Sequence, residues 1–235
     1  MNDWTPRRFW STAQAVPAEG GFTVHLDSRP LRTPRKAPLV LPTAALADAV
    51  AAEWQAQGER IDPVTMPFTR MANSAIDTVT AEHATIARIV SDYGGSDLLC
   101  YRAEGPAPLV ARQAEAWDPL LDWAAQHLHA PLRTTAGVVH VAQSPDSLRI
   151  LHGLVSDLSP FRLAAFHDLV SLSGSLILAL ALTRGRIAAD TAWRLSRIDE
   201  DWQISLWGED EEAAEVAQRK RAAFLDADRF YALCG

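Results

Sequence analysis

The stretch from Asp199 to Ala213 reads D-E-D-W-Q-I-S-L-W-G-E-D-E-E-A, and its pattern decides how the C-terminal part of the chain is interpreted. Apolar spacing predicts one helix over Ala189–Leu206, ended by Gly208. At 3.6 residues per turn, this helix has two stripes that contain apolar side chains. The inward stripe holds Thr191, Leu195, Ile198, Trp202 and Leu206, and the other holds Trp193, Glu200, Ile204 and Trp207. A surface helix normally has one apolar face, so a second layer of this protein or another protein must cover the second stripe.

Charge is concentrated in the same part of the chain. The 235 residues carry a net charge of −7, and ten acidic and four basic residues from Asp199 onward account for −6 of it. A nucleic-acid partner is disfavoured, because binding phosphates requires a basic surface. The acidity is therefore a local feature of the C-terminal region.

The first forty or so residues have the pattern of a small sheet. Alternation predicts strands over Ser11–Val16 and Phe22–Leu26, joined by a turn at Gly20-Gly21. A short strand is expected at Leu39–Leu41, and Thr43 is the expected N-cap of a helix that ends near residue 57.

The rest of the chain is helical in pattern, nearly to its end. The expected helices are Phe68–Val79, Ala84–Tyr93, Pro106–Ala116, Leu120–Leu128, Ser144–Leu158, Ser159–Thr183, Ala189–Leu206 and Glu209–Ala232. Asp118-Pro119 is interpreted as the start of a new helix. The predicted fold class is α+β, with a small N-terminal β-containing domain over residues 1–72 and a larger C-terminal helical bundle domain over residues 73–235.

Sequence motifs for catalysis and cofactor binding are absent. There is no G-x-G-x-x-G, Walker, G-x-S-x-G or H-E-x-x-H pattern, and Cys100 and Cys234 are the only cysteines. We therefore expect no catalytic residues, no cofactor and no metal. The most apolar run, Leu169–Leu182, is shorter than the roughly 20 residues that cross a bilayer, and no secretory signal opens the chain. We expect a cytoplasmic protein without membrane insertion.

The acidic residues near residue 200 fall into two groups. Residues 209–212 lie in the expected first turn of the last helix, where the helix dipole favours anions, so a structural role is sufficient for them. Glu200 differs, because a carboxylate between Trp193 and Trp207 is costly unless a cation meets it. The cation can be an arginine of a partner protein or an internal arginine such as Arg197, and the sequence leaves both open.

Several segments carry a family resemblance. They are L-D-S-R-P-L-R-T-P (Leu26–Pro34), A-E-W-Q-A-Q-G-E-R-I-D-P (Ala52–Pro63), M-P-F-T-R-M-A-N-S-A-I-D (Met66–Asp77), D-L-L-C-Y-R (Asp97–Arg102), W-D-P-L-L-D-W (Trp117–Trp123), G-S-L-I-L-A-L-A-L (Gly174–Leu182) and the opening stretch. In this order they resemble the assembly chaperone of the ATP synthase catalytic sector, the one that holds the alpha subunit. One departure is Ser28, where the family usually has glycine in a turn; serine would be strained there if that position needs a positive φ.

The resemblance implies a chaperone and not an enzyme. It implies binding of the free alpha subunit, whose interface stays shielded until the beta subunit replaces the chaperone. Glu200 is the first candidate for partner binding, and the further candidates are Trp193, Trp207, Asp199, Gln203, Asp210 and Glu212. We expect a monomer, and the missing mitochondrial transit segment points to a bacterial cytoplasmic member.

Two other functions remain open at this point. One is an enzyme with a carboxylate and arginine site at the domain junction, built from Asp62, Asp77 or Asp97 with Arg70 or Arg102. The other is a structural subunit of a larger complex, which would need permanent and more hydrophobic contacts.

Overall fold

The computed structural model describes residues 7–235, and the contacts of these residues divide them into two units. Among the described residues, the first unit comprises residues 7–83, 159–165 and 229–235. The second unit comprises residues 84–158 and 166–228. Two short segments from the C-terminal half of the chain thus belong to the first unit. The boundary after residue 72 stays a prediction.

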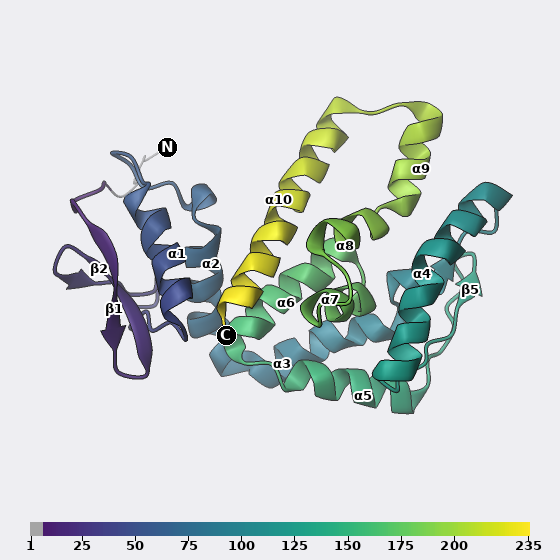
Figure 1. The fold of residues 1–235 in the computed structure, drawn as a ribbon, viewed down its shortest axis with the longest axis horizontal. Helices are drawn as coiled ribbons and strands as arrows, with labels where there is room; N and C mark the ends of the chain where they lie inside the picture. Colours follow the sequence, from purple (N-terminus) through teal and green to yellow (C-terminus); the bar gives the residue numbers. More distant parts are fainter. Residues whose placement is uncertain (1–6) are drawn as a thin grey trace. The chain divides into compact units, whose positions relative to one another are not determined.

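The first unit is built on a three-stranded antiparallel sheet that packs on one helix (Figure 1). Its elements are β1 (Ala13–Ala18), β2 (Gly21–Leu26), β3 (Arg29–Pro30) and α1 (Ala44–Gln55). The predicted N-cap is confirmed, since Thr43 Oγ1 accepts a hydrogen bond from the backbone N–H of Leu46 at 3.1 Å. The turn before β2 is confirmed as well. Gly21 has a φ of 156°, and an added Cβ would lie 2.3 Å from the Leu41 carbonyl oxygen, so only glycine fits.

Two expectations about the first forty residues change. Leu41 pairs with Phe22 only through an isolated bridge, so the short strand at 39–41 is not formed as such. In the turn after β2, the residue with a left-handed backbone is Asp27 (φ 54°) and not Ser28. The Asp27 carboxylate accepts hydrogen bonds from the backbone N–H groups of Thr12 (2.9 Å) and Ser11 (3.0 Å), and the first of these is the main cause that lowers the pKa of Asp27. The strain considered for Ser28 therefore does not arise.

A helical run follows the sheet. It consists of α2 (Pro67–Ser74), a π-helical turn (Ala75–Val79) and α3 (Thr80–Ser91), whose first residues still belong to the first unit. The predicted gap between two helices is present only as a kink at Glu82, where φ is −115°. The ring of Phe230 lies 6.2 Å from Phe68 and 6.5 Å from Phe161, so this aromatic cluster joins the three separate segments of the first unit.

The second unit is a helical bundle with a minimal sheet (Figure 1). Its helices are most of α3, then α4 (Ala107–His127), α5 (Pro145–Ser156), α6 (Pro160–Ser173), α7 (Leu176–Thr183), α8 (Ala189–Leu195), α9 (Ile198–Trp207) and α10 (Glu211–Leu233). The first residues of α6 and the last of α10 belong to the first unit. Strands β4 (Tyr101–Arg102) and β5 (Thr135–Ala136) pair in parallel. The predicted α+β fold, with a small N-terminal sheet followed by a mostly helical region, is confirmed.

Two predicted helix boundaries in this unit are wrong. The helix was expected to restart at Asp118-Pro119, but α4 continues through Pro119. Proline costs a helix one backbone hydrogen bond, and here burial of Trp117, Leu120 and Leu121 holds the helix together on both sides. The expected long helix over residues 159–183 is instead broken. Gly174 has a φ of 71°, and Ser175 caps α7 by accepting a hydrogen bond from the backbone N–H of Leu178 at 3.0 Å.

The apolar run predicted to be a buried helix lies in α6 and α7, and every residue from Leu176 to Leu182 is buried. No helix within residues 7–235 has both the length and the hydropathy needed to cross a bilayer.

Candidate partner-binding site

The expected single helix over residues 189–206 is two helices, α8 and α9. Ser196 and Arg197 separate them: Arg197 has a φ of −116°, and Ser196 Oγ donates a hydrogen bond to the Trp193 carbonyl oxygen at 2.7 Å. Because a break interrupts the 3.6-residue period, the two stripes predicted along one helix do not exist as continuous surfaces.

Trp193 is buried and does not lie on the face predicted for it. Its side chain is only 6% exposed and packs on Phe224 of α10, with ring centroids 5.7 Å apart. The guanidinium of Arg197 lies over the same indole at 5.6 Å. The prediction that Trp193 lies on an uncovered face is therefore wrong, because α10 of the same chain covers it.

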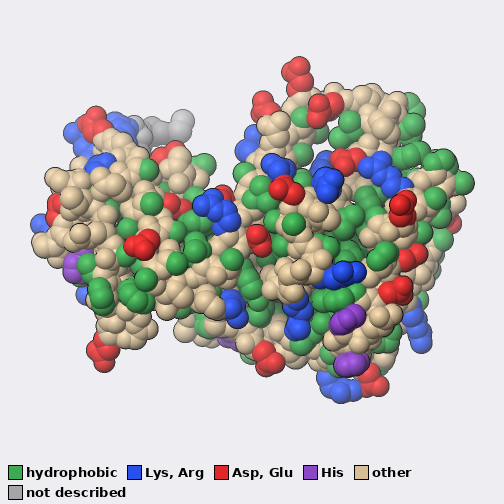
Figure 2. Space-filling view, in the orientation of Figure 1, with side chains coloured by type: hydrophobic (Ala, Val, Ile, Leu, Met, Phe, Trp, Pro, Cys, Tyr) green, Lys and Arg blue, Asp and Glu red, His purple; other side chains and the backbone are tan. Residues whose placement is uncertain are grey.

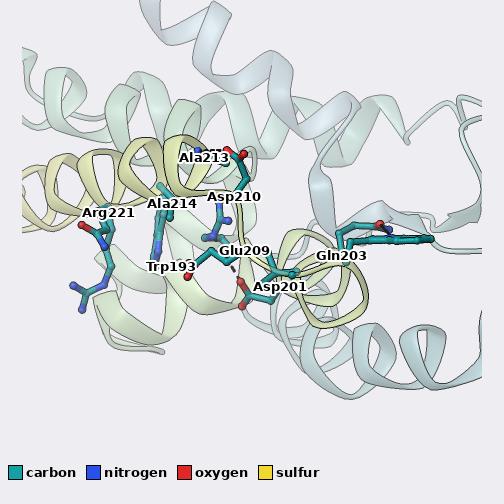
Figure 3. Close-up of a pocket in the computed structure, with 14 residues that line it drawn as sticks. Trp193, Asp201, Gln203, Glu209, Asp210, Ala213, Ala214 and Arg221 are labelled. Atoms are coloured by element: carbon teal, nitrogen blue, oxygen red, sulfur yellow. Dashed lines mark hydrogen bonds and ion pairs between the residues drawn. The ribbon is translucent and has the colours of Figure 1, made fainter.

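The end of α9 is exposed on more than one side. Trp207 is 82% exposed, Leu206 56% and Ile204 37%. Trp207 Nε1 donates a hydrogen bond to Gln203 Oε1 at 3.1 Å, which fixes the indole against its own helix; the Gln203 side chain lies at the right in Figure 3. Leu206 was expected to face inward, so the exposed apolar tip of α9 (Ile204, Leu206 and Trp207) is larger than the sequence indicated.

Two of the candidate carboxylates have structural roles. Asp199 accepts a hydrogen bond from Gln113 Nε2 of α4 at 2.6 Å, which ties the first turn of α9 to the bundle. Gly208 ends α9 with a φ of 86°, and Asp210 Oδ1 then accepts a hydrogen bond from the backbone N–H of Ala213 at 2.8 Å. Asp210 is thereby the N-cap of α10, which begins at Glu211 and not at Glu209 as predicted.

A groove lies between α9 and α10. It consists of two cavities of about 330 Å³ and about 430 Å³, which share Arg197, Asp210, Ala213 and Ala217 as lining residues. The first also contacts Trp193, Ile204 and Trp207, and the second contacts Glu200, Glu212 and Lys220. Figure 3 shows residues from both helices around the first cavity, and Figure 2 shows charged and apolar side chains together around the opening between α9 and α10. We call this feature the α9–α10 groove.

The groove is acidic on balance. Its lining contains five carboxylates, Glu200, Asp201, Glu209, Asp210 and Glu212, against three basic side chains, Arg197, Lys220 and Arg221. Arg221 already pairs with Asp190 of α8, outside the lining.

Glu200 has the internal partner that the sequence left open. Its side chain is 56% exposed and lies 3.9 Å from the Arg197 guanidinium, which is itself 3.8 Å from Asp201. Both separations exceed hydrogen-bonding distance, so these are loose ion pairs. Arg197 was considered only as a competing explanation for Glu200, and the structure shows that it borders both cavities.

Four of the five residues of the alternative enzyme site have partners within their own units. Asp62 accepts a hydrogen bond from the backbone N–H of Val64 at 3.0 Å, and Asp77 accepts one from Thr33 Oγ1 at 2.6 Å. Asp97 is fully buried and accepts a hydrogen bond from Ser175 Oγ at 2.7 Å. Arg102 pairs with Asp118 at 2.7 Å. Within residues 7–235, no group of three or more His, Cys, Asp or Glu side chains could hold a metal ion.

An exposed apolar tip beside an acidic groove is typical of a site that binds another protein. Comparison with known proteins assigns the chain to a class of such proteins. The family model described as "ATP12 chaperone protein" matches residues 7–125. The chain therefore belongs to the ATP12 chaperone family, the ATP synthase assembly chaperones that its sequence resembles.

Solved structures agree over almost the whole chain. The crystal structure of Atp12 from Paracoccus denitrificans is 55% identical in sequence, covers 99% of this chain and 100% of its own, and superposes with a TM-score of 0.95. The Atu1473 protein of Agrobacterium tumefaciens, named as a candidate chaperone, is 42% identical, with 98% of this chain and 87% of that chain covered and a TM-score of 0.94. Protein atp12 of Schizosaccharomyces pombe, named as mitochondrial, is 24% identical over 89% of this chain and 76% of its own length.

Proposed function

We propose that this protein binds the free alpha subunit of the ATP synthase catalytic sector at the α9–α10 groove. It shields the interface of that subunit until the beta subunit replaces the chaperone. Membership of the ATP12 chaperone family supports the class of function. The observation that carries the proposed location is the exposed tip of α9, with Trp207 82% exposed, directly beside the acidic groove.

The chemistry of this surface suits a temporary cap. Tryptophan is a frequent anchor of protein interfaces, because it buries a large apolar area and loses little entropy. The charged lining accelerates encounter and selects the partner more than it adds affinity. An interface of one apolar tip and a polar groove can therefore be weaker than the permanent alpha–beta contact, which lets the beta subunit displace it.

The candidates differ in what they can contribute. Trp207 and Glu200 present side chains to solvent at the groove, and Gln203 holds the Trp207 indole. Glu212 is exposed at the second cavity. Asp199 ties α9 to α4, and Asp210 caps α10, so we assign both residues to positioning.

Co-expression with a tagged alpha subunit tests the proposal. The chaperone should be retained by the alpha subunit when the beta subunit is absent and lost when it is present. Trp207→Ala and Glu200→Gln should each reduce retention while the fold stays intact. Val138→Ala and Glu115→Gln are matched controls, because both residues are exposed in the same unit and line neither cavity. Unchanged retention of both groove variants would remove this assignment.

Two further expectations accompany the proposal. The protein should be a monomer when purified alone, which size-exclusion chromatography checks. We also propose the bacterial cytoplasm as its compartment, because two of the similar solved proteins come from bacteria; cell fractionation would test this.

A further inference from the structure

Arg197 has an unusual position in the α9–α10 groove. It is the N-cap residue of α9, its side chain is 19% exposed, and it borders both cavities. Its guanidinium lies over the Trp193 indole at 5.6 Å, which orients it by a cation–π contact. An arginine carries five N–H donors in a rigid fork that suits carboxylates.

Arg197 makes no hydrogen bond to the carboxylates that it faces. The guanidinium lies 3.9 Å from Glu200 and 3.8 Å from Asp201, which is too far for a hydrogen bond to either. Asp199, the third carboxylate in the first turn of α9, is instead hydrogen-bonded to Gln113 at 2.6 Å. One shared cation therefore loosely balances two carboxylates at the edge of the groove.

The remaining lining also favours a cation from outside. Asp210 and Glu212 add negative charge from the N-terminal end of α10, where Lys220 offsets one of them, and Arg221 is engaged with Asp190 outside the groove. Ala213 and Ala217 give α10 a short apolar surface along the same groove. Cavities of about 330 Å³ and 430 Å³ lie near the lower end of the usual range for binding pockets, roughly 300 to 1,000 Å³, which suits one or two long side chains.

We propose that Arg197 is an internal placeholder for a cation of the client. The groove receives an arginine or lysine side chain of the alpha subunit, whose apolar stem packs on Ala213 and Ala217. Its charge pairs with Glu200 and Asp201, which then no longer pair with Arg197. The Arg197 guanidinium stays over the Trp193 indole. This inference rests on the proposed function and adds the chemistry of the partner group and the contact that it displaces.

The proposal predicts that removing the placeholder improves capture. Arg197→Met keeps an unbranched stem over Trp193 and removes the competing charge. We expect the dissociation constant for the isolated alpha subunit to fall about threefold to tenfold, the scale of one partly exposed ion pair. The affinity should also depend more steeply on salt. Arg197→Gln is a second variant with a polar stem, and urea unfolding confirms that each variant is folded.

Arg194→Met is the matched control. Arg194 is exposed on α8, contacts Thr191 at 3.3 Å and does not line the groove, so its removal changes the net charge by the same amount. Its effect on affinity should be small. In the double variant Arg197→Met with Glu200→Gln, the gain should shrink, because one of the two liberated carboxylates is gone and only Asp201 remains.

The outcomes separate the two proposals. Unchanged or weaker binding by the folded Arg197 variants would overturn the placeholder and make Arg197 a direct contact or a purely structural residue. An equal gain from Arg194→Met would overturn it as a net-charge effect. In both cases wild-type capture of the alpha subunit, lost in Trp207→Ala, would leave the proposed function intact. If the wild-type protein captures no alpha subunit, the proposed function itself fails.

Discussion

Helices α7 and α9 lie in the same unit and both have carboxylates at their N-terminal ends, but they use them differently. At α7, Asp97 is fully buried and accepts hydrogen bonds from Ser175 Oγ at 2.7 Å and from the backbone N–H of Ile177 at 3.0 Å, and every residue of this helix from Leu176 to Leu182 is buried. At α9, Glu200 is 56% exposed and only loosely paired, and the helix ends in an exposed apolar tip. A carboxylate whose hydrogen bonds are complete stabilises the fold, whereas a loosely paired one remains available to a partner.

The largest effect should come from breaking the buried carboxylate. Asp97→Ala leaves buried donors of Ser175, Ile177 and Leu99 without their acceptor, so we expect a loss of about 3 to 5 kcal/mol in the free energy of unfolding. Burial is the main cause that raises the pKa of Asp97. Asp97→Asn keeps an acceptor and should cost less. Urea unfolding measures both, and equal stability of the alanine variant and the wild type would contradict the comparison.

The two tryptophans near the groove should separate stability from binding. Trp193→Ala should cost about 3 kcal/mol of unfolding free energy, at the lower end for a buried aromatic because the vacated space borders the groove. Trp207→Ala should change the unfolding free energy by less than about 0.5 kcal/mol, because the side chain is 82% exposed. Capture of the alpha subunit should nevertheless fall about tenfold or more in Trp207→Ala. A large loss of stability in Trp207→Ala would show that the tip of α9 belongs to the core.

The start of α7 should also depend on its glycine. Gly174 has a φ of 71°, and an added Cβ would lie no closer than 3.9 Å to Leu98 Cβ, so Gly174→Ala introduces backbone strain without a clash. We expect a loss of about 1 to 2 kcal/mol. Gly153→Ala is the control of opposite sign, since Gly153 lies inside α5 with no atom within 4 Å of its added Cβ, and it should gain about 0.5 to 1 kcal/mol. Thermal unfolding that ranks the two variants in the reverse order would contradict this account.

The smallest effect is expected at a carboxylate of intermediate exposure. Asp168 hydrogen-bonds His167 at 3.1 Å, and this bond is the main cause that raises the pKa of His167 above its usual 6.5. A raised histidine pKa adds stability that is complete below about pH 6.5 and is lost as the pH rises through the folded-state pKa. Both side chains are nearly half exposed, so screening limits the gain to about 0.5 kcal/mol. His167→Gln should flatten the decline of unfolding free energy above pH 6.5, and parallel curves for both proteins would show that the pair adds nothing.

Local signals in the sequence predicted much of this structure. The Thr43 cap, the turn at Gly20-Gly21 and the end of α9 at Gly208 each depend on one residue type and its neighbours, and all are present. The succession of a small sheet and a larger helical region followed from the change of apolar period, which is also a local property.

The errors arose where distant segments decide the outcome. One long helix was predicted over the apolar run at residues 169–182 in spite of Gly174. A new helix starts after this glycine because Asp97, far away in sequence, accepts a hydrogen bond at its N-terminal end. Trp193 was predicted to lie on a face that this chain does not cover. The residue that covers it, Phe224, lies on another helix, and the local pattern does not reveal this contact. Of the candidate site, Glu200 and Trp207 lie exposed at the groove, and their binding of a partner remains a prediction.

Hydrogen exchange of the chaperone, alone and in complex with the isolated alpha subunit, tests the central claim most directly. We predict slower exchange in residues 198–217, which form α9, the turn and the start of α10, with no change in α7 because it is already buried. Formation of the complex without added protection in residues 198–217 would contradict the claim that the α9–α10 groove holds the client.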